Sequence, residues 1–264
     1  MAIVLQTLFI LLGLIILILL AFKMKSEKAE NVLPENYWDI LEEYVRFYRA
    51  LPEADKKLFE KRVEKFLKEV KITGVNAEVE ELDMMLIAAA AIIPVFAIPD
   101  WEYINLHEVL LYPGTFNQEF DQQGIDRYVS GMVGRGVMKD KMILTKWYLR
   151  QGFINQQDAH NTAIHEFVHL IDKMDGTMDG VPEIILERKY VKEWKALMTT
   201  TTNEINNGHS DINDYAATNH VEFFAVVAEY FFEQPALMAT RHPALFAMLE
   251  KIFKTNRDIV HLKS

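Results

Sequence analysis

The chain of 264 residues contains no cysteine, which excludes disulfides, thiol nucleophiles and cysteine-ligated metal sites. Basic residues are also scarce relative to acidic ones, and the net charge is −10. A nucleic-acid-binding surface needs a stripe of basic residues, so we expect no nucleic-acid partner. No internal repeat of 20–50 residues is visible, which argues against a solenoid or a propeller. The length suits one sizeable domain or two small ones.

The first segment of the chain differs from the rest in composition. Residues 2–22 are almost entirely apolar and would span about 30 Å as a helix, the thickness of a bilayer core. No basic residue precedes them, and no small-x-small cleavage pattern follows, so we predict an uncleaved membrane anchor rather than a signal peptide. Lys23, Lys25 and Lys28 come directly after the anchor. The positive-inside rule then predicts a single-pass protein of the cell inner membrane with the rest of the chain in the cytoplasm.

Beyond the anchor the sequence predicts mainly helices. Residues 34–70 have helical periodicity, and residues 84–96 are apolar all round, as in a buried core helix. Residues 108–112 and 141–145 are strand-like, and we interpret the glycines between 131 and 136 as turns, since they lack phosphate-loop spacing. We therefore expect a predominantly helical α+β fold with a small sheet.

The second half of the chain alternates predicted helices with one predicted loop. A helix should begin near 158–161 and end around 175–176, and another should cover 184–198. The polar run 199–213 is expected to be an exposed loop, and an apolar helix starts at Glu222. The predicted organisation is an anchor (1–22), a linker (23–33) and one main domain (34–264), with a helical part (34–98) and a second part (99–264) that contains the motif below.

The most informative stretch is His165-Glu166-Phe167-Val168-His169. On a helix, residues four apart project from the same face, so the two imidazoles can share one zinc ion. Glu166 lies about 100° round the helix, where it can act as general base on a zinc-bound water without being a ligand. The surrounding residues are apolar, and buried polar groups need a partner such as a metal. The stretch therefore predicts a hydrolytic zinc enzyme.

Catalytic zinc takes three protein ligands, so a third must be found. Asp175 stands where metzincins have their last ligand, but Asp172 replaces the glycine that this pattern needs to turn the chain. Glu222 and Glu229 lie seven residues apart on a downstream apolar helix, hence on one face. Each has an ordinary explanation too: Glu222 can form a capping box with Asn219, and Glu229 can be a partly buried residue paired with a lysine or arginine. Spacing alone does not choose between the two glutamates.

The paired stretches of this chain resemble a known family. The first is His165-Glu166-Phe167-Val168-His169-Leu170-Ile171-Asp172, preceded by His160-Asn161, and the second runs from Tyr215 through Glu222-Phe223-Phe224-Ala225-Val226 to Glu229-Tyr230-Phe231-Phe232. With Leu86-Ile87-Ala88-Ala89 and His107-Glu108-Val109-Leu110 to Tyr112-Pro113-Gly114, they are similar to the Mlc titration factor A family of zinc peptidases, the glucose-regulated metallopeptidases. The resemblance covers most of the chain from about residue 34.

The resemblance implies a site and a function. His165, His169 and Glu222 would bind one zinc ion per chain, Glu166 would be the general base, and the Tyr215 hydroxyl would stabilise the oxyanion. The implied fold is a gluzincin-like domain similar to the catalytic domain of anthrax lethal factor, acting on a peptide or protein substrate. The family also binds the glucose repressor Mlc, so a transcription regulator is a second implied partner. The anchor departs from the soluble members of the family.

Two further expectations concern residues near the motif. Asp172 lies on the face of His165, and we expect it either to orient a ligand imidazole or to face solvent at the helix end. The remaining histidines lack paired spacing and are expected to be surface residues, namely His160, His209, His220, His242 and His261. An alternative function from another class is a membrane-tethered protein that sequesters a transcription regulator and whose zinc site is structural or vestigial.

Overall fold

The computed structural model describes residues 32–117, 130–134, 139–155 and 158–254. Residues Glu35–Ser264 form one compact unit, distinct from Met1–Pro34. The anchor predicted at residues 2–22 lies outside the described residues. Within the described part of the chain, every helix is too short or too polar to cross a bilayer.

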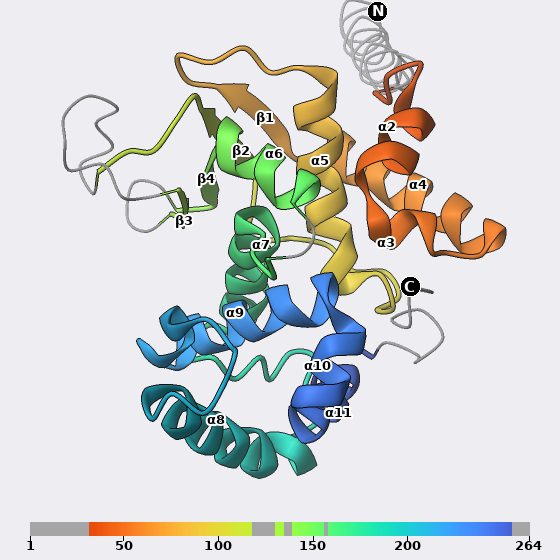
Figure 1. Cartoon of the computed structure of the whole chain (residues 1–264). Coiled ribbons are helices and arrows are strands. Elements are labelled where there is room, and N and C mark those ends of the chain that lie inside the picture. The colour runs from red at the N-terminus through yellow and green to blue at the C-terminus, as the bar shows by residue number, and fades with distance from the viewer. Residues whose placement is uncertain (1–31, 118–129, 135–138, 156–157, 255–264) are drawn as a thin grey trace, which may run out of the picture. The chain divides into compact units, whose positions relative to one another are not determined.

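The described part of the compact unit is predominantly helical, with one small sheet (Figure 1). Its α-helices are α2 (Tyr37–Tyr44), α3 (Arg46–Arg49), α4 (Glu53–Glu69), α5 (Glu81–Ile92), α6 (Lys146–Ile154), α7 (Thr162–Asp172), α8 (Val191–Asn206), α9 (His220–Glu233), α10 (Pro235–Arg241) and α11 (Pro243–Ile252). Its 3-10 helices are η1 (Ile93–Val95), η3 (Lys173–Asp175), η4 (Arg188–Tyr190) and η5 (Asp214–Ala217). Its strands are β1 (Lys71–Gly74), β2 (Glu108–Tyr112), β3 (Gly131–Val133) and β4 (Lys141–Thr145). The predicted α+β class with a small sheet is confirmed.

The sheet is mixed, with strand order β1-β2-β4-β3. β1, β2 and β4 are parallel, whereas β3 pairs antiparallel with β4 and forms an edge of the sheet. The strands predicted at 108–112 and 141–145 are confirmed as β2 and β4. The interpretation of the glycine stretch as turns was wrong at Gly131–Val133, because Met132 pairs with Ile143 of β4. A strand of three residues is too short to show an alternating pattern in the sequence. It can be recognised only from its pairing with a neighbouring strand.

Helix α5 is the buried core helix that the all-apolar run predicted. From Met85 to Ala91 its side chains have no exposed surface. It packs against α2, α4, α6 and α7, so neighbours surround it and no polar face is needed. Helix α7 in turn contacts α5, α6, β3 and α9, which places it in the middle of the unit, between the sheet and the C-terminal helices (Figure 1).

The predicted boundary between a helix and a loop near residue 199 was wrong. Helix α8 starts at Val191 and continues to Asn206, through most of the polar run. Its buried residues are Trp194, Met198, Thr201 and Ile205, at spacings of four, three and four, which is one face of a helix. Two of the four belong to the run expected to be a loop, and one of them is a threonine. The helical stripe was therefore hidden by the many threonines and asparagines on the other faces.

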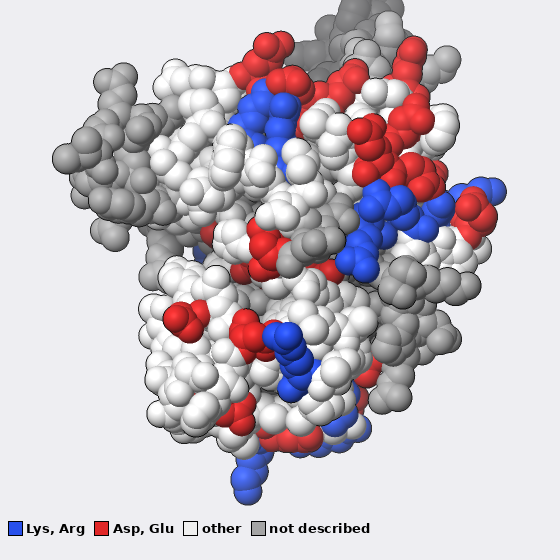
Figure 2. Space-filling view, in the orientation of Figure 1, with Lys and Arg blue, Asp and Glu red and all other residues white. Residues whose placement is uncertain are grey.

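The predicted helical region 34–70 forms α2 to α4, with the break at Leu51 and Pro52. Its charges are mixed in sign and lie on the surface, as the red and blue patches at the right of Figure 2 show. Several pair with one another, including Lys68 with Glu64 and Lys65 with Glu69. Exposed pairs of this kind contribute little to stability, so the buried residues between them hold these helices.

Candidate metal centre

Helix α7 carries the two histidines of the motif. The Asn161 side chain accepts a hydrogen bond from the Ile164 backbone N–H at 3.1 Å and caps the helix start, close to the predicted position. The helix ends at Asp172 and is followed by η3 and by Gly176, whose φ of 96° suits only glycine. His165 and His169 therefore project from one face, with ring centroids 4.6 Å apart and planes nearly perpendicular.

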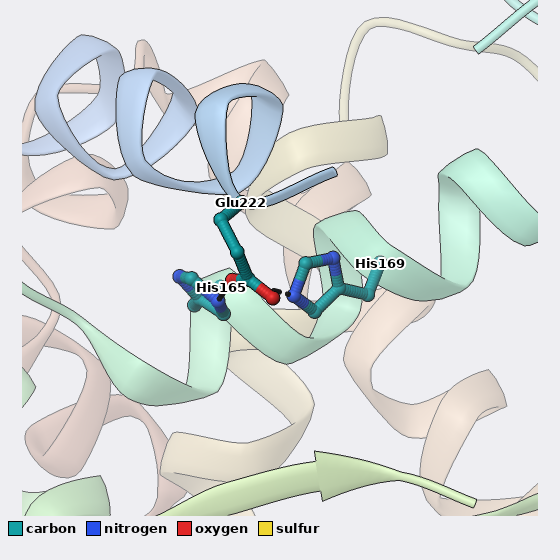
Figure 3. A group of neighbouring side chains, drawn as sticks. All are labelled: His165, His169 and Glu222. Carbon is teal, nitrogen blue, oxygen red and sulfur yellow. Dashed lines mark hydrogen bonds and ion pairs between the residues drawn. The ribbon is translucent and has the colours of Figure 1, made fainter. Parts of the chain in front are cut away.

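Helix α9 supplies a carboxylate to the same place. Its cap is Asn219, whose side chain accepts hydrogen bonds from the backbone N–H groups of Val221 and Glu222. The Glu222 carboxylate turns toward α7 and lies between the two imidazoles (Figure 3). Glu222 Oε2 is 3.0 Å from His165 Nε2 and 3.4 Å from His169 Nε2. Two residues of one helix and one of another thus converge on a single point.

The donor set fits a zinc ion. Zinc takes nitrogen and oxygen ligands at about 2.0–2.2 Å in tetrahedral geometry, which separates neighbouring donor atoms by roughly 3.3–3.6 Å. The donor atoms of His165, His169 and Glu222 all lie within 4.8 Å of one another, and this is the one such group of three in the described part of the chain. In addition, His169 Nδ1 is buried without a hydrogen-bond partner, so its ring is not held by an alternative protein network.

The electrostatics of the group reflect the close approach of histidines and carboxylates. Burial opposes a charge on the His165 imidazole, but the Glu229 and Glu222 carboxylates outweigh it and raise its pKa to about 10. Burial likewise opposes ionisation of Glu222, yet the two histidines hold the pKa of this carboxyl well below its usual range. Glu222 is therefore ionised, the form in which a carboxylate binds metal, whereas His165 must release a proton before its Nε2 can bind a metal ion.

Glu229, the other candidate for the third ligand, occupies a different position. Its Oε1 accepts a hydrogen bond from His165 Nδ1 at 2.6 Å, on the opposite side of the ring from Glu222. Its Oε2 accepts from the Asn161 backbone N–H at 2.5 Å and lies 3.1 Å from His160 Nδ1. The ordinary explanation considered for Glu229, pairing with a lysine or arginine, is wrong, because its partners are two histidines and a backbone amide.

Glu166 is almost completely buried on α7, with 6% of its surface exposed. Burial raises the pKa of its carboxyl, and the nearby histidines partly offset this. It lies directly against Gly131, the first residue of β3: a Cβ on that glycine would be 2.8 Å from Glu166 Oε1. The two residues line a cavity of about 290 Å³ with Ser130, Ala159, His160, Thr162, His165, Asn213, Tyr215, Val226 and Glu229.

Tyr215 is at this cavity as well, on the short helix η5 that precedes α9. Its ring centroid is 6.1 Å from that of His165, and its side chain is half-exposed. Partial burial and then the Glu222 and Glu166 carboxylates raise the pKa of its hydroxyl to about 12, so the phenol keeps its proton at neutral pH. All five residues singled out in the sequence therefore lie together.

The two aspartates near the motif have other partners. The Asp172 carboxylate is buried, which contradicts the solvent-facing alternative, and it accepts a hydrogen bond from the Gly180 backbone N–H at 2.8 Å. Neither imidazole of the motif is among its hydrogen-bond partners in the described residues. Asp175 accepts from the backbone N–H groups of Thr177 and Glu183 and holds a turn.

Sequence reasoning missed two residues of the site. His160 is half-exposed, as expected of a surface residue, but its Nδ1 meets the buried carboxylate of Glu229. Gly131 was interpreted as a turn residue and instead lies against Glu166. The position of His160 directly before the cap of α7 is a local signal. Gly131 has none, because its neighbour is 35 residues away in sequence.

The fold and the site together define a class: a mostly helical α+β domain whose two central helices bring a His-His-Glu donor set beside a buried glutamate. Comparison with known proteins agrees with that class. The sequence pattern of the glucose-regulated metallo-peptidase family M90 matches residues 21–254. The chain belongs to this family, whose name implies a metal ion.

Individual relatives are similar over most of their length. An uncharacterized protein of Synechocystis, slr2042, is 30% identical over 241 residues, which is 87% of this chain and 87% of that protein. Mlc titration factor A of Enterobacter is 31% identical over 198 residues, covering 69% of this chain and 72% of that protein. Mlc titration factor A of Escherichia fergusonii is 30% identical over 208 residues, 73% of this chain and 76% of its own length.

Proposed function

We propose that this protein is a zinc-dependent peptidase with a gluzincin-like catalytic domain, in which His165, His169 and Glu222 hold one zinc ion. The observation that carries the proposal is the approach of Glu222 Oε2 to both imidazole Nε2 atoms, at 3.0 and 3.4 Å, beside the buried Glu166. Membership of a family named for metallopeptidases supports it. The cavity of about 290 Å³ beside Glu166 supports an open, catalytic site rather than a closed structural one.

The chain's own residues divide the chemistry between them. When bound, zinc polarises the peptide carbonyl and lowers the pKa of water to about 7. Glu166 accepts the proton of the attacking water and transfers it to the leaving amine. Its burial favours this role, because a raised pKa brings a carboxylate nearer to the pH at which it must both take and give a proton. The contact with Gly131 keeps the carboxylate in place.

Tyr215 is the proposed oxyanion donor. Its hydroxyl remains protonated at neutral pH and lies at the cavity, so it can donate a hydrogen bond to the oxygen that becomes negative as water adds to the carbonyl. Because the side chain is half-exposed on a short helix, it can turn toward the substrate without disturbing the core.

A second function is favoured by the names of the relatives. Several relatives are called Mlc titration factor A, which names a regulator that they titrate. On this alternative the protein would bind and sequester a transcription regulator, with a structural or vestigial metal site. The two functions differ in their need for Glu166, since sequestration requires no general base.

We also propose that residues 1–22 anchor the protein in the cell inner membrane, with residues 34–264 in the cytoplasm. The support is the length and apolarity of the segment and the three lysines that follow it. Protease protection of a C-terminal tag in inside-out and right-side-out vesicles tests the orientation.

The deciding experiment is Glu166→Gln in the full-length chain. We expect zinc content equal to that of the wild type and a loss of peptide hydrolysis by about 10²–10⁴-fold, the usual contribution of a general base. Metal analysis and cleavage of a peptide library by both proteins measure this. Full activity in the variant would rule out the mechanism. If neither protein hydrolyses peptides and the variant keeps the cellular phenotype of the wild type, sequestration is the function.

A further inference from the structure

Two glutamates of α9 hold opposite sides of the same imidazole. Glu222 Oε2 lies 3.0 Å from His165 Nε2, and Glu229 Oε1 accepts a hydrogen bond from His165 Nδ1 at 2.6 Å. The two glutamates are seven residues apart, which is two helical turns and about 10 Å along one face. One helix therefore supplies both a proposed metal ligand and the group that holds another ligand in place.

The second oxygen of Glu229 has two donors of its own. Oε2 accepts from the Asn161 backbone N–H at 2.5 Å and lies 3.1 Å from His160 Nδ1. Only 1% of Glu229 is exposed, so both oxygens are occupied within the protein. A carboxylate whose two oxygens are both directed at fixed donors cannot change orientation without breaking several hydrogen bonds at once. It is thus suited to fixing the orientation of its partners.

The His160 ring is fixed at one nitrogen and exposed at its other end. Its side chain is 51% exposed and lines the same cavity as Glu166 and Tyr215. Because Nδ1 faces Glu229, Nε2 lies on the far side of the ring, and it has no hydrogen-bond partner among the described residues. The backbone supports this placement: Asp158 accepts from the His160 N–H, and Ala159 adopts a φ of 55°.

We propose that Glu229 is a positioning residue for two imidazoles, holding His165 with Nε2 toward the metal and His160 with Nε2 toward the cavity. There the Nε2–H of the His160 imidazolium, the form in which both ring nitrogens carry a proton, donates a hydrogen bond to a carbonyl or carboxylate oxygen of a bound peptide. The inference rests on the proposed zinc site. It adds a residue that orients a ligand through its other nitrogen, which fixes both ring orientation and ligand basicity.

The first test measures zinc affinity and needs no enzymatic activity. Full-length wild type, Glu229→Gln and Glu233→Gln, purified in detergent, are titrated with zinc against a chromogenic chelator. We expect zinc binding to weaken by about 10–100-fold in Glu229→Gln, the usual effect of losing such a partner. Glu233, one turn further along α9, is also buried, so Glu233→Gln is the matched control and should stay within twofold of wild type. Wild-type affinity in Glu229→Gln, or equal losses in both variants, would overturn the proposal.

The second test measures how much His160 contributes to the binding of a peptide. His160→Asn keeps a donor at the place of Nδ1 but has none at Nε2, whereas His160→Gln keeps one near Nε2. The probe is a tripeptide hydroxamate, which binds without being hydrolysed. We expect His160→Asn to bind it at least fivefold more weakly, His160→Gln to recover part of the loss, and both to keep wild-type zinc affinity. Unchanged hydroxamate binding in His160→Asn would remove the role of His160.

These outcomes separate the inference from the proposed peptidase function. If the wild type binds zinc but cleaves no peptide, the proposed function fails, while the zinc affinity of Glu229→Gln still decides whether Glu229 positions His165. If the wild type binds no hydroxamate, the substrate-facing role of His160 is wrong even where the zinc result holds.

Discussion

Four buried or partly buried glutamates around α7 and α9 differ in their surroundings rather than in their chemistry. Glu166 lies against β3, Glu222 between two imidazoles, Glu229 between two histidines and an amide, and Glu233 in a small pocket with Asn161, with one oxygen unpartnered. The same side chain is therefore proposed as a base, a ligand and a positioning group. The atoms that surround each carboxylate decide which of these roles it can take.

At Tyr215 the prediction concerns the hydroxyl alone. Tyr215→Phe keeps the ring beside His165 but removes the oxyanion donor, and the loss of one such donor costs about 2.7–4 kcal/mol of barrier. We expect kcat to fall by about 10²–10³-fold with zinc content unchanged, measured by steady-state kinetics. Tyr148→Phe on α6 serves as the control. If Tyr215→Phe turns over substrate as fast as the wild type, the Tyr215 hydroxyl does not stabilise the oxyanion.

At Gly131 the prediction concerns the lack of room for a side chain beside Glu166. A methyl group there would lie 2.8 Å from the Cγ and Oε1 atoms of Glu166, so Gly131→Ala must displace the proposed base. Small displacements of catalytic groups can cost 10²-fold, and we expect a loss of kcat/KM of about this size with zinc affinity intact. Gly114→Ala is the matched control, because its Cβ would meet no atom within 4 Å. Equal activity of the two variants would contradict the contact.

At the scale of single elements, α9 combines a metal face with a buried acid at its C-terminal end. Burial, followed by the neighbouring Glu229 charge, raises the pKa of Glu233 to about 8. The folded state then binds a proton that the unfolded state, with a pKa near 4.5, has released. Stability must therefore fall as pH rises from about 4.5 to 8, since folding retains a proton that base removes.

The corresponding variant is Glu233→Gln, which resembles the protonated acid at every pH. Compared with the wild type we expect it to be more stable at pH 9, by at most about 5 kcal/mol, since each pKa unit between 4.5 and 8 corresponds to about 1.4 kcal/mol. At pH 4 the two proteins should unfold alike. Melting temperatures by circular dichroism at pH 4, 6 and 9 measure this, and parallel pH profiles would show that Glu233 titrates normally.

At the scale of the whole molecule, the proposed zinc ion connects two helices that are far apart in sequence. Ligands from α7 and α9 are shared only in the folded state, so free zinc at 100 times its Kd should stabilise the fold by about 2.7 kcal/mol. For a domain of this size that corresponds to roughly 5–11 °C in Tm. Removal of zinc with a chelator should lower the Tm by this amount.

Glu222→Ala tests whether zinc stabilises the fold by connecting α7 and α9. Its Tm should respond little to zinc, whereas Glu166→Gln should respond like the wild type, because Glu166 is not a proposed ligand. Thermal unfolding with and without zinc compares the three proteins. A full zinc response in Glu222→Ala, together with its loss in Glu229→Ala, would make Glu229 the third ligand.

The sequence by itself determined the parts of the site that are local. The His165-to-His169 spacing, the cap at Asn161 and the apolar run of α5 each depend on a few neighbouring residues and on helical geometry, and they were predictable. The same local reasoning failed for α8, whose buried stripe includes a threonine, and for β3, which exists only as the partner of β4.

The resemblance implied Glu222 as the ligand, but only the tertiary structure showed how the positions of Glu222 and Glu229 differ. Both lie on one face of α9, and spacing treats them alike, but the packing of α9 across α7 brings one carboxylate to the Nε2 side of His165 and the other to its Nδ1 side. The contact of Gly131 with Glu166 and the placement of His160 were decided in the same way. The physical reason is that periodicity specifies the face on which a residue lies, whereas helix packing specifies which atoms of a neighbour it meets.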